Sequence, residues 1–282
     1  MKITKFHTGV ALTTSLLLAA LTGCGAANTA SSSASSSTST SVSASSNSAK
    51  KHTSFFVKDN GDGTKVIKDI DGKEVTVPTN PERIADLWHA NNQVVLLLGG
   101  AEKLVSTTTN VKSLAWFKQV YPGIEKVDAP VKGTDVNMEQ LLADKPEVLL
   151  ASSKDQIAKA TEAGIPAVHV EFQNFADLKR TVELTAEVIG TDEAIERAEK
   201  YLAYLEKNEN LIKERLQGVT ESPKVLHIAG GSDLTKVDGS NSLIGEWMKL
   251  SGAKNSLDGV ENLKNISLEQ IIASQPEYII IG

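Results

Sequence analysis

The chain contains one pattern twice, as NMEQLLADKPEVLLAS at residues 137–152 and as SLEQIIASQPEYIIIG at residues 267–282. Glu, Gln, Ala, Pro and Glu coincide in the two copies, and their apolar positions match. Each copy has the pattern of a capped helix, a proline turn and a buried strand. A helix-turn-strand unit repeated at this length predicts two similar α/β lobes in one chain.

The segments around the two copies support this interpretation. Residues 66–77, VIKDIDGKEVTV, predict a β-hairpin that turns at Asp71-Gly72. From residue 83 to residue 172, short apolar strands alternate with amphipathic helices, which predicts a parallel sheet covered on both faces. Residues 175–217 show only helical spacing, and alternation resumes after Pro223. The expected fold class is therefore α/β, with two α/β lobes joined by a long rigid helix.

The first fifty residues have a different composition. Lys2 and Lys5 precede an apolar run that ends at Leu21-Thr22-Gly23-Cys24, which resembles the lipobox of bacterial lipoproteins. A stretch rich in Ser, Thr, Ala and Asn follows and cannot bury enough apolar area to fold. The expected organisation is a signal peptide at 1–23, a lipidated, disordered tether at 24–55, an N-terminal lobe at 56–174, a helical connector at 175–218 and a C-terminal lobe at 219–282. The second lobe shows two clear strands where the first shows four, so we expect it to be incomplete at the C-terminal end.

Composition excludes several classes of function. The 282 residues carry 29 Lys and Arg against 35 Asp and Glu, a net charge of −6, which argues against a nucleic-acid partner. The single cysteine, Cys24, allows neither an intrachain disulfide nor a cysteine-based metal cluster. The sequence contains no GxSxG elbow and no HExxH pair, so an extracytoplasmic hydrolase is the weakest of the functions considered.

The order of these parts resembles the iron-siderophore, haem and cobalamin family of substrate-binding proteins of ABC transporters. The resemblance covers residues 60–282 and is carried by DGKEVTVPTNPERIADL, AGIPAVHVEF, GEWMKLSGAKNSL and the two repeats. It implies the class III periplasmic-binding-protein fold and a protein that catalyses nothing and has no intrinsic cofactor. Such a protein captures a small-molecule metal complex, here an iron complex, and delivers it to an ABC permease dimer with its cytoplasmic ATPase. We expect it outside the cytoplasm, held by its lipid to the outer face of a Gram-positive cytoplasmic membrane.

Ligands of open α/β sheets bind beyond the carboxyl ends of the strands. Residues that follow the expected strands, together with nearby aromatic side chains, are therefore the ligand-binding candidates. They are Trp88, His89, Asn91, Asn92, Trp116, Lys154, Phe172, Gln173, Gly231 and Ser232.

His89 is the best placed candidate for direct metal coordination, although a helix-start histidine bonded to backbone is equally compatible with the sequence. His169 and His227 lie inside apolar strands and Trp247 lies at helical spacing, so all three are expected in the core. A receptor for Zn, Mn or Ni ions remains an alternative on the same fold. No arginine follows an expected strand, which argues against a strongly anionic ligand.

Glu139 and Glu269 occupy the same position in the two repeats. A carboxylate in the first turn of a helix is favoured by the helix dipole, which by itself explains an acidic residue there. The family resemblance implies a second role, in which one glutamate on each lobe pairs with arginines of the permease.

Overall fold

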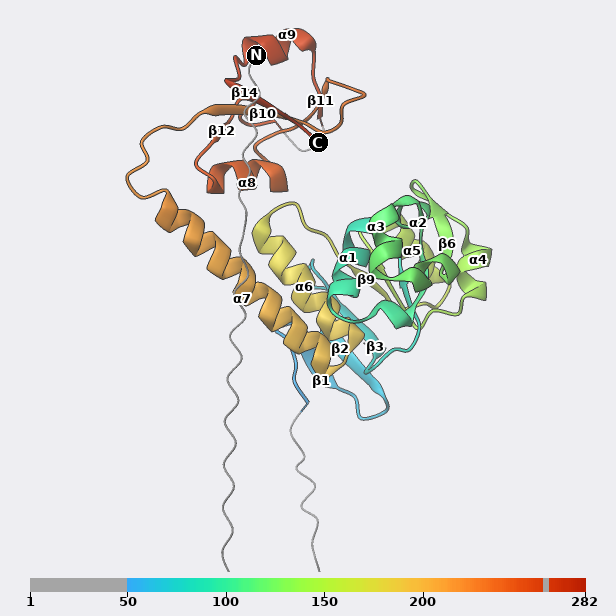
Figure 1. The fold of residues 1–282 in the computed structure, drawn as a ribbon. Coiled ribbons are helices and arrows are strands. Elements are labelled where there is room, and N and C mark those ends of the chain that lie inside the picture. The colour runs from blue at the N-terminus through green and yellow to red at the C-terminus, as the bar shows by residue number, and fades with distance from the viewer. Residues whose placement is uncertain (1–49, 261–263) are drawn as a thin grey trace, which may run out of the picture. The chain divides into compact units, whose positions relative to one another are not determined.

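The computed structural model describes residues 50–260 and 264–282, arranged as a two-lobe α/β fold (Figure 1). The described part begins with a three-stranded antiparallel sheet made of β1 (Phe56–Asp59), β2 (Thr64–Lys68) and β3 (Glu74–Pro78). The predicted hairpin is β2–β3, and its turn has Gly72 at φ 85°. Asp69 stabilises this turn because its Oδ1 accepts hydrogen bonds from the backbone N–H groups of Asp71 and Lys73.

The N-terminal lobe contains a six-stranded sheet in the order β7-β6-β5-β4-β8-β9. All neighbours are parallel except β7, which pairs antiparallel with β6. The strands are β4 (Ile84–Asp86), β5 (Leu104–Thr108), β6 (Asp128–Lys132), β7 (Asp135–Val136), β8 (Val148–Ala151) and β9 (Ala167–His169). The helices are α1 (His89–Leu97), α2 (Thr109–Ser113), α3 (Ala115–Val120), α4 (Met138–Ala143) and α5 (Lys154–Glu162), with 3-10 turns at Ala101–Lys103 and Pro122–Lys126.

The predicted helical connector consists of two helices that lie side by side, α6 (Phe175–Ile189) and α7 (Asp192–Arg215) (Figure 1). Gly190 separates them in a left-handed conformation, with φ 76°. A side chain there would meet the Thr79 carbonyl, because an added Cβ would lie 2.2 Å from that oxygen. The inner face of α6 packs into the same hydrophobic core as α1 and the sheet, which makes α6 part of the N-terminal packing unit.

The described residues of the second lobe form five short strands, more than the two evident from sequence. They are β10 (Lys224–Ile228), β11 (Lys236–Asp238), β12 (Lys254–Asn255), β13 (Lys264–Asn265) and β14 (Tyr278–Ile281), with α8 (Leu243–Leu250) and α9 (Leu268–Ala273) as helices. β10 is central: it pairs parallel with β12 and β14 and antiparallel with β11. The two copies of the repeated sequence form the same secondary structure. The helix and strand have matching bounds in α4–β8 and α9–β14, and the helices have N-caps at the matching residues Asn137 and Ser267.

The end of the predicted tether lies against α6 and α7. Lys51 N–H donates to Asp192 Oδ1 at 3.3 Å, and Thr53 N–H donates to Glu187 Oε2 at 2.8 Å. The ring of His52 stacks on Phe56 with centroids 3.5 Å apart. Polar side chains of α6 and α7 therefore hold residues 51–54, the last part of the predicted tether. The predicted signal peptide and Cys24 lie outside the described residues.

Candidate functional site

Four strand ends of the N-terminal lobe surround one cavity of about 390 Å³, which we call the strand-end cavity. The turns after β4, β5, β6 and β8 supply its lining. The lining residues are Leu87, Trp88, His89, Thr108, Thr109, Asn110, Gly133, Thr134, Ser152, Ser153 and Gln156. His89 is the only titratable side chain among them, so the cavity is lined by hydroxyl, amide and aromatic groups without a fixed charge.

Local helix signals place these side chains at the cavity. A helix begins within three residues of the end of each of the strands β4, β5 and β8. The short turn between strand and helix therefore lies at the carboxyl ends of the strands. Thr108 Oγ1 accepts from Val111 N–H and Ser153 Oγ accepts from Gln156 N–H, which are N-cap bonds of α2 and α5. Trp88 occupies the N-cap position of α1 without a side-chain cap bond. Its indole is consequently free to form the wall of the cavity.

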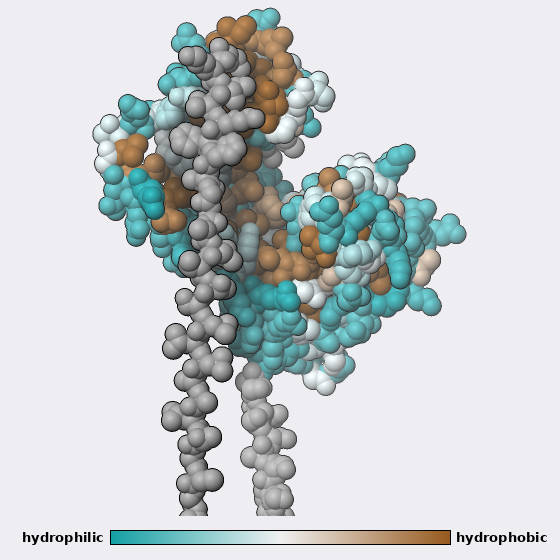
Figure 2. Space-filling view, in the orientation of Figure 1, coloured by the Kyte–Doolittle hydropathy of each residue, from teal (hydrophilic) through white to brown (hydrophobic). Residues whose placement is uncertain are grey.

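An apolar cavity of about 690 Å³ lies next to the Trp88 wall. Trp88 contacts Phe172 with ring centroids 4.8 Å apart, and Phe172 in turn lines this apolar cavity together with Trp116 and Tyr201. Trp116 is 38% exposed and stacks on Phe117 at 3.8 Å. Figure 2 shows hydrophobic patches within the mainly hydrophilic surface of this lobe. The structure thus brings together three of the predicted aromatic residues, Trp88, Trp116 and Phe172.

Asn91 and Asn92 require a correction, because both are completely buried. Asn91 contacts Asp86 Oδ2 through Nδ2 and Thr185 Oγ1 through Oδ1. Asn92 Nδ2 donates to the Asp86 and Trp88 carbonyls. Both amides lie on the inner face of α1, beneath the turn that carries Trp88, so neither can contact a ligand in the cavity.

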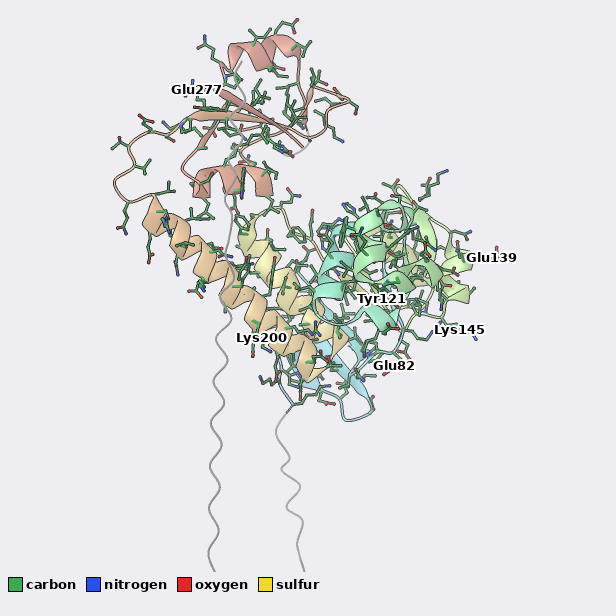
Figure 3. The ribbon with its side chains drawn as sticks, viewed as in Figure 1. Glu82, Tyr121, Glu139, Lys145, Lys200 and Glu277 are labelled. Carbon is green, nitrogen blue, oxygen red and sulfur yellow. The ribbon has the colours of Figure 1, made fainter. Side chains whose placement is uncertain are left out.

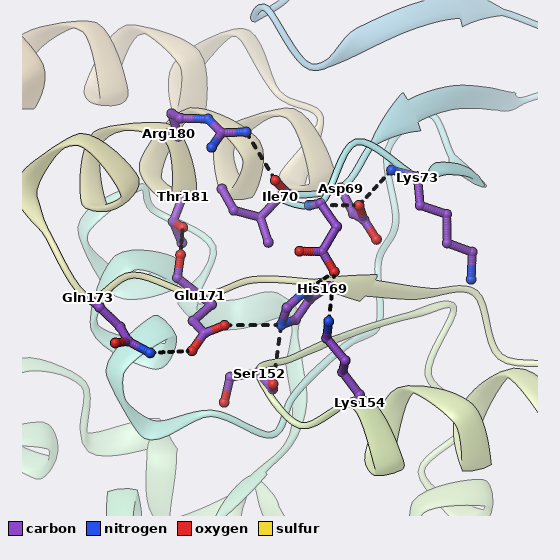
Figure 4. Close-up of polar contacts among 11 residues, drawn as sticks. Asp69, Ile70, Lys73, Ser152, Lys154, His169, Glu171, Gln173, Arg180 and Thr181 are labelled. Carbon is purple, nitrogen blue, oxygen red and sulfur yellow. Dashed lines mark hydrogen bonds and ion pairs between the residues drawn. The ribbon is translucent and has the colours of Figure 1, made fainter. Parts of the chain in front are cut away.

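Lys154 and Gln173 lie apart from the strand-end cavity, in a polar cluster around His169 (Figure 4). His169 Nδ1 lies 3.0 Å from Asp71 Oδ2, and Lys154 Nζ lies 3.4 Å from the same oxygen. Burial opposes ionisation of Asp71, but His169 and Lys154 outweigh it and lower the pKa of that carboxyl. Gln173 Nε2 donates to Glu171 Oε1 at 3.0 Å. This cluster fastens the β2–β3 turn to the end of β9, and His169 is buried within it as predicted.

The predicted ligand-binding residues of the second lobe are exposed. Gly231 and Ser232 follow β10 in a turn. His227 is half-buried rather than fully buried, and its Nδ1 lies 2.6 Å from Asp238 Oδ2. Trp247 is 47% exposed, so its placement in the core was wrong: α8 is short and turns this position outward.

Glu139 lies at the surface in the first turn of α4 (Figure 3), and Glu269 lies at the surface in the first turn of α9. A hydrogen bond from its own backbone N–H, together with Ser267, lowers the pKa of Glu269.

The described residues contain no group of three or more His, Cys, Asp and Glu side chains arranged to hold a metal ion. Within residues 50–260 and 264–282, no helix combines the length and apolar character needed to cross a bilayer.

Sequence reasoning missed Gly133, Thr134 and Gln156. The first two follow β6, a strand of sequence DAPVK whose proline and flanking charges hide any alternation. The turn glycine at residue 133, with φ 64°, was the available signal. Gln156 lies in the first turn of α5, and its Nε2 donates to the Thr134 carbonyl at 3.3 Å, which ties the β6 and β8 turns together.

Comparisons with known proteins agree with this architecture. The family model described as "Periplasmic binding protein" matches residues 84–282. The chain belongs to the periplasmic binding protein family. Members of this family bind solutes for ABC transporters, so the prediction of a non-enzymatic substrate-binding protein is confirmed at that level.

Individual relatives of this periplasmic binding protein are distant. It is 24% identical to the uncharacterized ABC transporter substrate-binding lipoprotein YvrC of Bacillus subtilis, over 76% of this chain and 68% of the relative. The crystal structure of the molybdate-binding protein MolA of Haemophilus influenzae is similar with a TM-score of 0.69, at 23% identity over 77% of this chain and 73% of that one. The vitamin B12-binding protein BtuF of Vibrio cholerae gives a TM-score of 0.59, at 16% identity over 72% and 76%. These likenesses confirm the class III two-lobe fold.

Proposed function

We propose that this periplasmic binding protein captures an iron complex of the siderophore type, held as an uncharged chelate, at the strand-end cavity. The observation that carries the proposal is the lining: hydroxyl and amide groups beside an indole, with no arginine or lysine. Such groups suit a ligand that offers oxygen acceptors and an apolar body. A ferric hydroxamate has this chemistry, whereas a catecholate or carboxylate complex would require cationic side chains to balance its charge.

Trp88 has the largest side chain among the residues that line the cavity and is the residue to test. Replacing it with Ala should weaken binding by about tenfold or more, because a stacked ring contributes on the order of 1–3 kcal/mol. The assay is quenching of tryptophan fluorescence during titration with a ferric hydroxamate. The matched control is Trp247→Ala, which removes an exposed indole on α8 and should leave the affinity unchanged. Equal affinity in Trp88→Ala and wild type would place the site elsewhere.

An oxyanion receptor is the second candidate. α1 and α5, which are each nine residues long, both begin at the strand-end cavity. Helix N-termini favour anions through their free N–H groups and dipoles. The similar protein MolA is a molybdate-binding protein whose structure holds molybdate. Calorimetry with molybdate and with a ferric hydroxamate separates the candidates, since each predicts heat from only one of the two titrations.

We also propose the delivery route that the family implies. Acylated Cys24 would anchor the protein outside the cell membrane, and Glu139 and Glu269 would meet arginines of a permease dimer that works with an ATPase. Both glutamates are exposed in the first turn of a helix and are not part of the hydrophobic core. Changing both to Gln should leave ligand affinity intact and abolish uptake. Normal uptake by the double variant would reduce both residues to helix-dipole partners.

A further inference from the structure

Asp86 is a buried ionisable group directly beneath the strand-end cavity. It is the last residue of β4 and has no solvent exposure. Two residues later the chain reaches Trp88, whose backbone N–H donates to Asp86 Oδ1 at 3.1 Å. The carboxyl group therefore holds the turn that presents Trp88 and His89.

The other carboxyl oxygen connects to a chain of buried amides and hydroxyls. Asp86 Oδ2 lies 3.0 Å from Asn91 Nδ2, and Asn91 Oδ1 lies 3.0 Å from Thr185 Oγ1 on α6. Beside this chain, Thr107 Oγ1 on β5 lies 2.7 Å from Asn92 Oδ1. We call these five side chains the Asp86 network. It ties β4, β5, α1 and α6 together under the Trp88 turn.

No cation of the described residues balances this carboxyl group. Among the described residues Asp86 takes part in no ion pair, and the side chains that reach the network from α1, β5 and α6 are all uncharged. Arg83 and His89, the titratable residues nearest in sequence, are both exposed, and the Arg83 side chain donates to the Lys145 and Asp144 carbonyls instead. An ionised carboxylate without a cation is very unfavourable in a dry interior. Burial accordingly raises the pKa of Asp86 well above its usual value, against the opposing effect of its two hydrogen bonds.

The same heavy-atom positions suit the uncharged acid. The oxygen and nitrogen of an Asn amide are assigned from the hydrogen-bond network, so the Asn91 amide can be turned over. Asp86 Oδ2–H then donates to Asn91 Oδ1, and Asn91 Nδ2–H donates to Thr185 Oγ1. The heavy-atom distances of this network are kept: the Asn91 oxygen and nitrogen exchange places, and Thr185 Oγ1 changes from donor to acceptor.

We propose that Asp86 is the positioning residue for the Trp88–His89 turn, and that it performs this role as an uncharged carboxylic acid. The role as support for a ligand site rests on the proposed function, whereas the placement of Trp88 does not. An uncharged Asp86 leaves no negative charge behind the cavity, which agrees with a neutral or anionic solute rather than a bare cation.

The test measures the fluorescence of Trp88 in the absence of any ligand. The chain has three tryptophans, so Trp116→Phe with Trp247→Phe leaves Trp88 as the only indole. In this background Asp86→Asn mimics the neutral acid: its Oδ1 accepts from Trp88 N–H and its Nδ2–H donates to the turned Asn91. We expect Asp86→Asn to keep the emission maximum and the iodide quenching that the background shows with Asp86 unchanged. Asp86→Ala removes both contacts and should shift emission to the red and raise quenching.

Two further measurements separate the acid from a carboxylate. Asp144→Asn removes the other aspartate whose pKa is raised by burial, at the opposite edge of the sheet, and serves as the common background. In the Asp144→Asn background, the folding equilibrium constant should fall by up to tenfold for each pH unit above the usual aspartate range. The reason is that Asp86 keeps its proton in the folded state and loses it in the unfolded state. Adding Asp86→Asn should abolish this slope and also remove the infrared band of a protonated carboxyl.

The proposal is overturned if Asp86→Asn exposes Trp88 as strongly as Asp86→Ala does, or if the pH slope and the infrared band survive in Asp86→Asn. Should Asp86→Ala fail to fold, Asp86→Asn alone decides the question. A protein that passes these tests but binds no ferric hydroxamate refutes the proposed ligand and leaves the role of Asp86 intact.

Discussion

The buried ion pair between Lys65 and Glu187 offers a quantitative test of how the N-terminal sheet is held to α6. Lys65 Nζ lies 2.9 Å from Glu187 Oε1 and also donates to the Glu187 carbonyl, while the two side chains are 0% and 1% exposed. Glu187 additionally accepts from Thr53 N–H and contacts His52 Nδ1 at 3.0 Å. Burial alone would raise the pKa of Glu187, but Lys65 and these hydrogen bonds outweigh it and lower the pKa.

Removing one partner leaves the other charge buried and uncompensated. Lys65→Met should therefore cost about 3–5 kcal/mol of unfolding free energy, which lowers the melting temperature by about 6–20 °C in a protein of this size. The double variant Lys65→Met with Glu187→Met should lose much less than the sum of the two single variants, because hydrophobic residues of similar volume replace a buried pair at little cost.

The assay is urea unfolding followed by circular dichroism, completed as a double-mutant cycle. The control is Lys159→Met, which breaks an exposed pair with Asp155 and should cost less than about 1 kcal/mol. Because the folded pKa of Glu187 is lowered, its contribution is present above the unfolded value of 4.5 and is lost as pH falls below it. Additive single losses in the cycle, or a Lys65→Met loss no larger than that of Lys159→Met, would refute the reasoning.

Three other predictions concern separate parts of the chain. Gly190→Ala should destabilise the protein by more than about 1 kcal/mol in thermal unfolding, since its φ is 76° and a Cβ would lie 2.2 Å from the Thr79 carbonyl oxygen. The control Gly218→Ala, with φ 81° and open space around it, should cost less. Equal losses in the two variants would contradict the steric argument. Burial raises the pKa of Asp144, so the wild type should lose stability as pH rises through that folded pKa. Asp144→Asn should flatten this part of the pH–stability profile measured by urea unfolding. An unchanged slope would count against a raised pKa of Asp144. Cys24→Ala should release the protein from membranes in detergent partitioning, and unchanged partitioning would argue against acylation.

Most elements of the fold were predictable because their signals are local. The β2–β3 hairpin follows from a two-residue turn at Asp71-Gly72, and the alternation of strands and helices over residues 83–172 follows from the apolar pattern. The strands that were missed, such as β6 and β11, are short and carry proline or charged residues, so their pairing depends on neighbouring strands rather than on their own pattern. The site was predictable in outline for the related reason that strand ends in α/β sheets face the ligand.

Local sequence could not show which side of a helix or strand meets the interior. Asn91 and Asn92 are polar and follow a strand, yet α1 turns them under the sheet edge, where Asp86, Thr107 and Thr185 complete their hydrogen bonds. Those partners come from three separate elements, β4, β5 and α6, and only the folded chain brings them to α1.

The repeated pattern shows the same division. By itself the sequence determined a helix, a proline turn and a strand in both copies, because caps, periodicity and turn residues act within a few positions. The tertiary structure decided how each copy is used. β8 lies between β4 and β9 and is fully buried, whereas β14 pairs with β10. Burial is a property of neighbours in space, and two nearly identical sequences acquire different neighbours only when the whole lobe has folded around them.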